Sequence, residues 1–142
     1  MNEDFVLDCS VTMTWFFVHE ATEATDELLE RLTRDATAIV PEHWRLEVGK
    51  VLLVAERTKG KTRSDTEHFL SLLNALAIET DVRTDRRAHA QILSLARDHR
   101  LTTYDAAYLD LAMVRGLPLA SLDMELRAAA KKLGVRLLPA KV

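Results

Sequence analysis

The part of the chain that decides the fold lies near its C-terminal end, where residues 119–138 read LASLDMELRAAAKKLGVRLL. The apolar runs 119–122 and 135–138 each predict a short buried strand. Residues 124–133 between them predict a helix, which Gly134 ends after two lysines near the negative end of the helix dipole. Two strands joined through a helix are typical of a parallel sheet.

The same alternation continues toward the N-terminus. Further strands are expected at 5–7 and 38–40, with another candidate at 77–82. Helices are expected over 11–18, 25–34, 41–59, 64–76, 85–99 and 103–115. Pro41 suits a first helical position, Ser64 with Glu67 matches a capping box, and Thr102 suits an N-cap. The predicted fold class is α/β, a three-layer α/β/α sandwich with a central parallel sheet, and residues 1–142 are expected to form a single domain.

The glycines support these helix ends. Gly60, Gly116 and Gly134 each follow basic residues, which predicts left-handed residues that terminate helices. Gly49 lies inside a predicted helix, where glycine costs about 1 kcal/mol relative to alanine. We interpret Gly49 as a point of close backbone packing.

The composition is that of a soluble globular protein. The chain has 142 residues, of which 48% are hydrophobic and 29% charged. Its 19 basic and 22 acidic residues give a net charge of 19 − 22 = −3, which argues against a protein that coats DNA without specificity. A single cysteine, Cys9, cannot form an internal disulfide. The acidic start and the lack of an apolar run of about 18 residues favour a cytoplasmic protein without a membrane segment.

Two aspartates follow predicted strands directly. Asp8 ends the run Val6-Leu7-Asp8, and Asp123 follows the strand at 119–122. Both are expected at the C-terminal edge of the sheet, where open α/β sheets bind their ligands. Aspartates at strand ends also form turns and cap helices, so neither residue alone indicates a site.

Two further carboxylates lie on apolar helix faces. At about 100° per residue, Glu47 borders the arc that holds Trp44 and Val51. Asp105 projects from the inward face of a nearly apolar helix with no basic residue one turn away, whereas Asp110 points roughly opposite and is the weaker candidate. Each buried carboxylate needs compensation. Pairing with a buried Arg or Lys is one solution; we favour several carboxylates that share a divalent cation.

The ligand chemistry favours Mg²⁺ or Mn²⁺ over zinc, because no His or Cys cluster accompanies the carboxylates. The histidines lack metal-binding spacing and are interpreted as surface or structural residues: His19, His43, His68, His89 and His99. Four carboxylates around one or two Mg²⁺ ions would hold water and a phosphate group and activate the first against the second. This arrangement predicts hydrolysis of phosphodiester bonds.

Four stretches carry a family resemblance: VLDCSV (6–11), PEHWRLEV (41–48), LTTYDAAYL (101–109) and PLASLD (118–123). In this order, across nearly the whole chain, they resemble the PIN-domain family and, within it, the VapC-like ribonuclease toxins of bacterial and archaeal toxin–antitoxin pairs. Each stretch is weak alone, but the ordered set is specific. The resemblance implies a Mg²⁺- or Mn²⁺-dependent endoribonuclease that acts on RNA as the toxin of such a pair.

The resemblance also assigns residues and partners. It implies that the catalytic and metal-binding acids are Asp8, Glu47, Asp105 and Asp123. Ser10 and Ser121 match positions where the family places a hydroxyl that supports the carboxylates or the bound water, although threonine is more frequent at the second. The expected partners are a second copy of the chain, in a homodimer, and a cognate antitoxin whose extended C-terminal segment lies over the active groove.

Two clusters could serve substrate or assembly. Basic residues gather on and after the helix that carries Glu47, and they suit either an RNA path or a solvated helix face: Arg45, Lys50, Arg57, Lys59, Lys61 and Arg63. The aromatic run at 15–17 is interpreted as core or dimer contacts rather than a base-stacking platform. Together with the apolar helix at 108–114, it exceeds what a small domain easily buries, which favours a homodimer.

Two other functions compete with this prediction. The run Asp8-Cys9-Ser10 superficially resembles the aspartyl-nucleophile phosphatases, but Ser10 stands where those enzymes carry their second Asp, the proton donor to the leaving group. The other candidate is a non-catalytic module that binds RNA or protein through the same fold. Metal binding without turnover of any RNA would favour that module.

Overall fold

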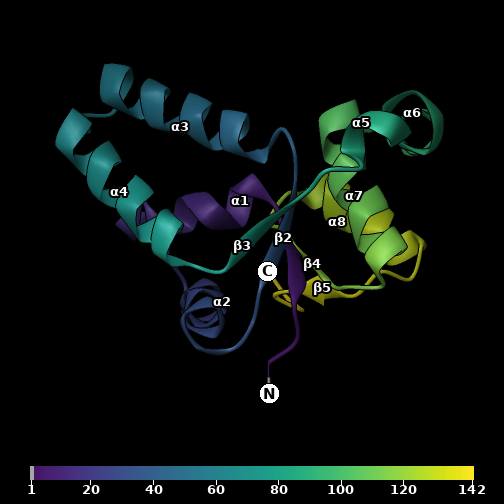
Figure 1. The fold of residues 1–142 in the computed structure, drawn as a ribbon, viewed down its shortest axis with the longest axis horizontal. Helices are drawn as coiled ribbons and strands as arrows, with labels where there is room; N and C mark the ends of the chain where they lie inside the picture. Colours follow the sequence, from purple (N-terminus) through teal and green to yellow (C-terminus); the bar gives the residue numbers. More distant parts are fainter. Residues whose placement is uncertain (1) are drawn as a thin grey trace.

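A parallel sheet runs through the middle of the molecule in residues 2–142, the part of the chain that the computed structural model describes. Its strand order is β3-β2-β1-β4-β5, and every neighbouring pair is parallel (Figure 1). The strands are β1 (Phe5–Leu7), β2 (Ala38–Pro41), β3 (Ile78–Asp81), β4 (Leu119–Ala120) and β5 (Leu137–Leu138). The central β1 is fully buried, as expected for a strand covered on both faces.

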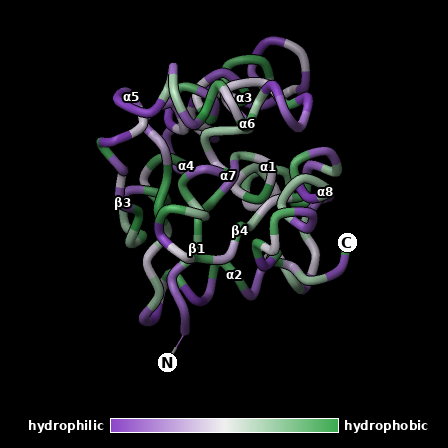
Figure 2. The backbone as a smooth tube through the Cα atoms, turned by 90° about the vertical axis from the view of Figure 1, so that its right-hand side faces the viewer, coloured by the Kyte–Doolittle hydropathy of each residue, from purple (hydrophilic) through white to green (hydrophobic). Residues whose placement is uncertain are grey.

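Helices form the two outer layers. Figure 1 shows α1–α4 on one side of the sheet and α5–α8 on the other, which confirms the α/β/α sandwich. The longer helices are α2 (Glu23–Arg34), α3 (Trp44–Thr58), α4 (Arg63–Ala75), α7 (Thr103–Arg115) and α8 (Met124–Lys132). The shorter ones are α1 (Cys9–Thr12), α5 (Thr84–Arg87) and α6 (Leu93–His99), with 3₁₀ turns at Met13–Trp15 and Val18–Glu20. Figure 2 shows the hydrophobic colour concentrated along inner segments such as β1.

Several element boundaries differ from the sequence prediction. Pro41 does not open a helix; it is the last residue of β2, paired with Asp81 of β3, and α3 begins at Trp44. A proline is tolerated there because β1 pairs with β2 only as far as Ile39, so the missing N–H breaks no bond on that side. The predicted helix 85–99 is divided by a π-helical turn at Ala88–Ile92.

The predicted capping box of α4 is also wrong. Thr62, not Ser64, accepts a bond from the backbone N–H of Asp65, and Asp65 accepts one in return from the backbone N–H of Thr62. Both pairs have the spacing of a capping box, and the one nearer Gly60 forms. Thr102 caps α7 as predicted.

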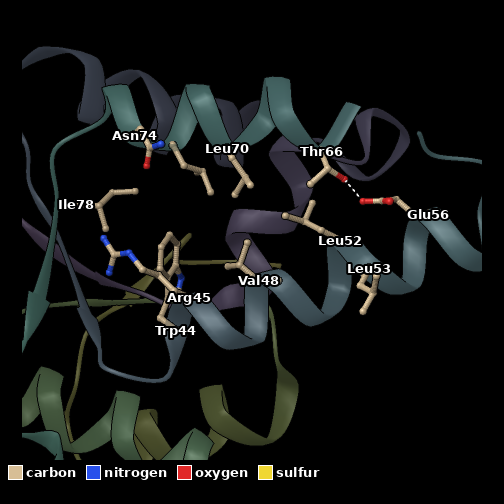
Figure 3. A pocket seen from close by; sticks show the side chains of 12 residues that line it. Trp44, Arg45, Val48, Leu52, Leu53, Glu56, Thr66, Leu70, Asn74 and Ile78 are labelled. Carbon is tan, nitrogen blue, oxygen red and sulfur yellow. Dashed lines mark hydrogen bonds between the residues drawn. The ribbon is translucent and has the colours of Figure 1, made fainter. Parts of the chain in front are cut away.

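The glycine predictions divide in the same way. Gly60, Gly116 and Gly134 have φ of 72°, 64° and 74°, which confirms their left-handed conformation. Gly49 does not pack closely, because a Cβ added to it would meet no heavy atom within 4 Å. It lines an open cavity of about 480 Å³ between α3 and α4, into which Val48 and Leu70 project (Figure 3).

The aromatic run at 15–17 is covered within the chain. Phe16 and Phe17 are buried, and Phe16 packs against Phe69 of α4 with ring centroids 5.1 Å apart. The ammonium groups of Lys59 and Lys61 lie 5.1 and 4.8 Å from the Phe17 and Phe16 rings, so these two basic residues also cover the core. The apolar surplus that favoured a homodimer is therefore mostly satisfied in the monomer.

Part of helix α7 does remain uncovered. Met113 and Val114 near its C-terminal end are 44% and 42% exposed, although residues 106–112 are buried.

In the described part of the chain, no helix has the length and apolarity needed to cross a bilayer.

Candidate active site

Asp8 lies where β1 and β4 end side by side. Its backbone N–H donates to the carbonyl of Ala120, which places the Asp8 side chain next to Ser121. The hydroxyls of Ser10 and Ser121 both donate to the same carboxylate oxygen of Asp8, Oδ2, at 2.7 Å each. The other oxygen, Oδ1, accepts no hydrogen bond from any residue in 2–142. One side of the carboxylate is therefore fixed by the protein, and the other is left for a ligand.

The two serines also join the ends of the strands. Ser10 Oγ accepts a bond from the backbone N–H of Leu122 at 2.9 Å, and Ser121 Oγ accepts one from that of Asp123 at 3.1 Å. Each hydroxyl thus links the Asp8 carboxylate to the loop that carries Asp123. These bonds hold the two strand-end aspartates in a fixed relation.

Asp123 serves as the N-cap of α8. Its Oδ1 accepts a bond from the backbone N–H of Leu126 at 2.9 Å, the capping arrangement that the sequence offered as the alternative to a ligand role. Asp8 occupies the N-cap position of α1 but makes no such bond. A capping aspartate engages one oxygen, so its second oxygen stays available.

Glu47 in the first turn of α3 is held by groups from two elements. The hydroxyl of Tyr108, a fully buried residue of α7, donates to Glu47 Oε1. His43 Nε2 lies 3.3 Å from the same oxygen, without the alignment of a hydrogen bond. Burial acts to raise the pKa of Glu47, but the contacts with His43 and Tyr108 outweigh it, so the pKa is lowered. The lowered pKa favours the ionised carboxylate of Glu47, which is the form that binds a cation.

Asp105 is half-buried at the start of α7. Its backbone N–H donates to the capping hydroxyl of Thr102 at 3.1 Å. Burial, together with the negative charges of Asp123 and Glu47, raises the pKa of Asp105. The structure thus brings the carboxylates of α3, α7 and the β4–α8 loop near enough to repel one another.

The other buried aspartates of the fold are compensated by arginines. Arg87 forms two hydrogen bonds with Asp110, at 2.7 and 2.8 Å, so Asp110 faces away from Asp105 as predicted. Asp81 pairs with Arg83 and Arg115. Across residues 2–142, no Lys, Arg or His forms an ion pair with Asp8, Asp105 or Asp123. The fold therefore balances none of these three charges with a basic side chain.

The donor chemistry of this group fits a hard divalent cation. Every free donor is a carboxylate oxygen, and the unbalanced negative charge would be relieved by a cation. The side-chain positions fit a cation less well than the chemistry does, because no three Asp, Glu, His or Cys side chains of residues 2–142 are placed to hold a metal ion. The arrangement presents the ligands around one edge of the sheet without assembling them into a coordination sphere.

The burial of Asp8 should contribute a loss of stability to the metal-free protein as the pH rises. Burial is the main reason that its pKa rises from 3.8 to about 6, with Asp105 and Glu47 adding to the effect. Between these two pKa values the folded state binds more protons than the unfolded state. The contribution of Asp8 to the free energy of unfolding therefore falls as pH increases, by on the order of 3 kcal/mol.

The measurement is a series of melting temperatures at pH 4–7 in chelator, for the wild type and Asp8→Asn. The introduced amide keeps an acceptor for both serines but does not titrate, so the difference between the two proteins isolates Asp8. We expect that difference to grow in favour of the variant as pH rises. Parallel pH curves would contradict the buried, uncompensated carboxylate.

Sequence reasoning missed three residues that support the site. Tyr108 and His43 contact Glu47. The interpretation of His43 as a surface or structural residue omitted its place one helical turn before Glu47. Arg127 of α8 is buried, with its guanidinium donating to the carbonyls of Ser121 and Ala140 at 2.9 and 3.2 Å. Arg127 thereby holds the carbonyl of the residue whose hydroxyl binds Asp8.

Comparison with known proteins agrees with this fold. A structure of PAE2754 from Pyrobaculum aerophilum is similar over 98% of this chain and 93% of that one, with a TM-score of 0.69 and 22% sequence identity. A structure of VapBC2 from Rickettsia felis, bound to a DNA fragment from its promoter, is similar over 94% of this chain and 96% of that one, with a TM-score of 0.65 and 12% sequence identity. Curated protein sequences give no match. The family model described as PIN domain matches residues 5–132, nearly the full length, and the chain therefore belongs to the PIN domain family.

Proposed function

We propose that this protein is a Mg²⁺- or Mn²⁺-dependent endoribonuclease that hydrolyses RNA phosphodiester bonds. The observation that carries the proposal is the set of carboxylates at one edge of the sheet, three of which have no basic partner in residues 2–142. The same fold neutralises Asp81 and Asp110 with arginines. This contrast between acids that have arginine partners and acids that have none supports a cation at the second group.

The residues that would hold the metal are Asp8, Glu47, Asp105 and Asp123. When bound, a divalent cation would polarise a phosphoryl oxygen of the substrate and lower the pKa of a bound water molecule. Ser10 and Ser121 keep the Asp8 carboxylate turned so that Oδ1 is free. Tyr108 restrains Glu47 by occupying one of its oxygens. The protein contributes fixed orientation, which lowers the cost of ordering these side chains around a substrate.

The biological role that we propose is the toxin of a toxin–antitoxin pair in the cytoplasm. The support is the resemblance of the four motif stretches to VapC-like toxins and the similarity to the VapBC2 structure. This role implies a cognate antitoxin protein as partner. The homodimer stays a prediction, supported by the resemblance and by the exposed Met113 and Val114 rather than by the aromatic run.

A non-catalytic module of the same fold is the alternative function. It would use the carboxylates to bind a metal or a basic partner without turnover. The two functions differ in one observable, the cleavage of RNA when metal is present. The phosphatase alternative gains nothing from the structure, because the Ser10 hydroxyl donates to Asp8 and supplies no acid for a leaving group.

Adding millimolar Mg²⁺ or Mn²⁺ should raise the melting temperature and switch on RNA cleavage. A ligand that binds only the folded state at 10 to 100 times its Kd stabilises by about 1.4 to 2.7 kcal/mol, or roughly 4–10 °C for a domain of this size. The measurement is a thermal scan with each ion or chelator, alongside incubation with a mixed RNA pool. NaCl at equal ionic strength is the matched control. No shift and no cleavage with either ion would refute the proposal, and a shift without cleavage would support the non-catalytic module.

A further inference from the structure

A small cavity adjoins the candidate active site on the side of α5. It has a volume of about 210 Å³ and lies among the β2–α3 loop, α5, the π-helical turn and the first turn of α7. Its lining includes Glu42, His43, Asp85, Ile92 and Tyr104. Pockets for drug-sized molecules are typically about 300–1,000 Å³, so this cavity suits one small, compact group.

The walls of this cavity suit a flat aromatic ligand. Tyr104 is 61% exposed, an unusual state for a large aromatic side chain next to the core. Its ring lies 5.2 Å from the His43 ring, centroid to centroid, with the planes inclined at 58°. Ile92 and Ala107, both buried, add apolar side chains to the lining. An exposed aromatic ring in a partly apolar cavity is an environment in which unpaired bases stack.

Two residues of the cavity lining adjoin the carboxylates of the candidate site. Tyr104 directly precedes Asp105 on α7, and the His43 imidazole lies 3.3 Å from Glu47. A group bound against Tyr104 and His43 would therefore sit beside the acids that we assign to phosphodiester hydrolysis. In RNA, the group next to a phosphodiester is a nucleoside.

The negative charge of the cavity lining favours the base of a nucleotide over its phosphate. Its lining holds two carboxylates, Glu42 and Asp85, and no Lys or Arg. Glu42 Oε1 accepts a bond from the backbone N–H of Asp85 at 3.3 Å, while Oε2 accepts none from the described residues. A phosphate would be repelled here, whereas an exocyclic amino group would find acceptors. Adenine, cytosine and guanine carry such a donor, and uracil does not.

We propose that this cavity is a nucleobase subsite that stacks one RNA base on Tyr104 and favours a base with an exocyclic amino group. The inference rests on the proposed ribonuclease function and adds a determinant of its specificity. Tyr104 contacts the substrate through its ring. Glu42 and Asp85 contribute acceptors at the edge of the base.

The test measures RNA binding in the Asp105→Asn background, in which the RNA is expected to survive. The probes are fluorescein-labelled hexanucleotides that differ at one position, which is A, C, G, U or abasic. Tyr104→Ala should weaken binding of the amino-bearing RNAs by about 5- to 150-fold, the range for loss of one base–aromatic stack. Tyr104→Phe keeps the ring and should stay within about threefold. Val18→Ala, 80% exposed and outside the cavity, is the control.

The pattern across the probes decides the outcome. When the varied position is the one that occupies the cavity, we expect RNAs with A, C or G there to bind the parent protein more tightly than the RNA with U. The parent should bind the abasic RNA about as weakly as Tyr104→Ala binds the amino-bearing RNAs. Glu42→Gln should reduce the preference for amino-bearing bases while binding of the uridine probe is kept. Equal affinities of Tyr104→Ala and its parent for every probe would overturn the subsite, and would leave the cavity to a protein segment.

Cleavage by the otherwise wild-type protein separates this inference from the proposed function. RNA cleavage that is insensitive to Tyr104→Ala, in both rate and sequence preference, refutes the subsite and leaves the ribonuclease intact. Base-dependent binding without cleavage under any metal condition refutes the ribonuclease, while the base-binding cavity stands.

Discussion

Replacing Asp105 with asparagine is expected to abolish metal-dependent RNA cleavage while the metal-free fold is kept. The carboxylate has no basic partner in residues 2–142, and its pKa is raised by burial and by the charges of Asp123 and Glu47. Asparagine preserves the shape and one acceptor oxygen but removes a charge that the metal-free fold tolerates poorly. The melting temperature in chelator should therefore stay the same or rise slightly. Activity should fall by about 10²- to 10³-fold or more, the loss typical of removing one electrostatic contact to a transition state.

The measurement pairs two readouts on the same preparations. The melting temperature is taken in chelator, and cleavage of a mixed RNA pool is followed with Mg²⁺. Wild-type protein sets both scales, and the rise in melting temperature on adding Mg²⁺ reports whether the variant still binds the ion. A variant that cuts RNA at nearly the wild-type rate, or that melts many degrees lower without metal, would remove Asp105 from the proposed site.

The fold could be predicted because its signals are local. The apolar runs that became β1 and β2 are short and bounded by polar residues, and helix α7 has a capping threonine and a terminal glycine at the predicted positions. The errors fell where two local signals compete. Pro41 suits both a strand end and a first helical turn, and Thr62 and Ser64 offer overlapping capping boxes. Tertiary contacts decide such cases, as β3 does by pairing with β2 through Pro41.

The site could be predicted only in part, for a related reason. Helical periodicity placed Asp105 and Asp110 on opposite faces, and the structure agrees. Periodicity could not show which groups hold Glu47 or Asp8, because these groups are distant in the sequence. Tyr108 lies 61 residues from Glu47, and Ser121 lies 113 residues from Asp8. Tyr104, the aromatic residue that lines the cavity, does not stand out in the sequence, because it is one residue of the motif at 101–109. The run at 15–17, with three consecutive aromatic residues, was the more conspicuous aromatic signal. Phe16 and Phe17 of that run are buried.

Asp110→Asn should have the opposite effect to Asp105→Asn, although the two residues lie on the same helix. Asp110 is 5% exposed and accepts two hydrogen bonds from the Arg87 guanidinium. Asparagine leaves the guanidinium without its counter-charge in a mostly buried place. Breaking a buried pair costs about 3–5 kcal/mol, and the 28% exposure of the Arg87 side chain brings our expectation to about 2–4 kcal/mol. For a domain of this size, that cost lowers the melting temperature by roughly 6–15 °C.

Cleavage by Asp110→Asn, measured well below its melting temperature, should remain near wild type, because Asp110 faces away from the carboxylates at the sheet edge. The double variant Arg87→Met with Asp110→Leu tests the cause. Removing both charges leaves no unpaired ion, so it should recover most of the lost stability, whereas Arg87→Met alone should strand the aspartate and destabilise. Additive losses in the double variant would show that packing rather than the ion pair sets the cost. If Asp110→Asn instead melted like wild type and lost cleavage, the roles of the two aspartates on α7 would have to be exchanged.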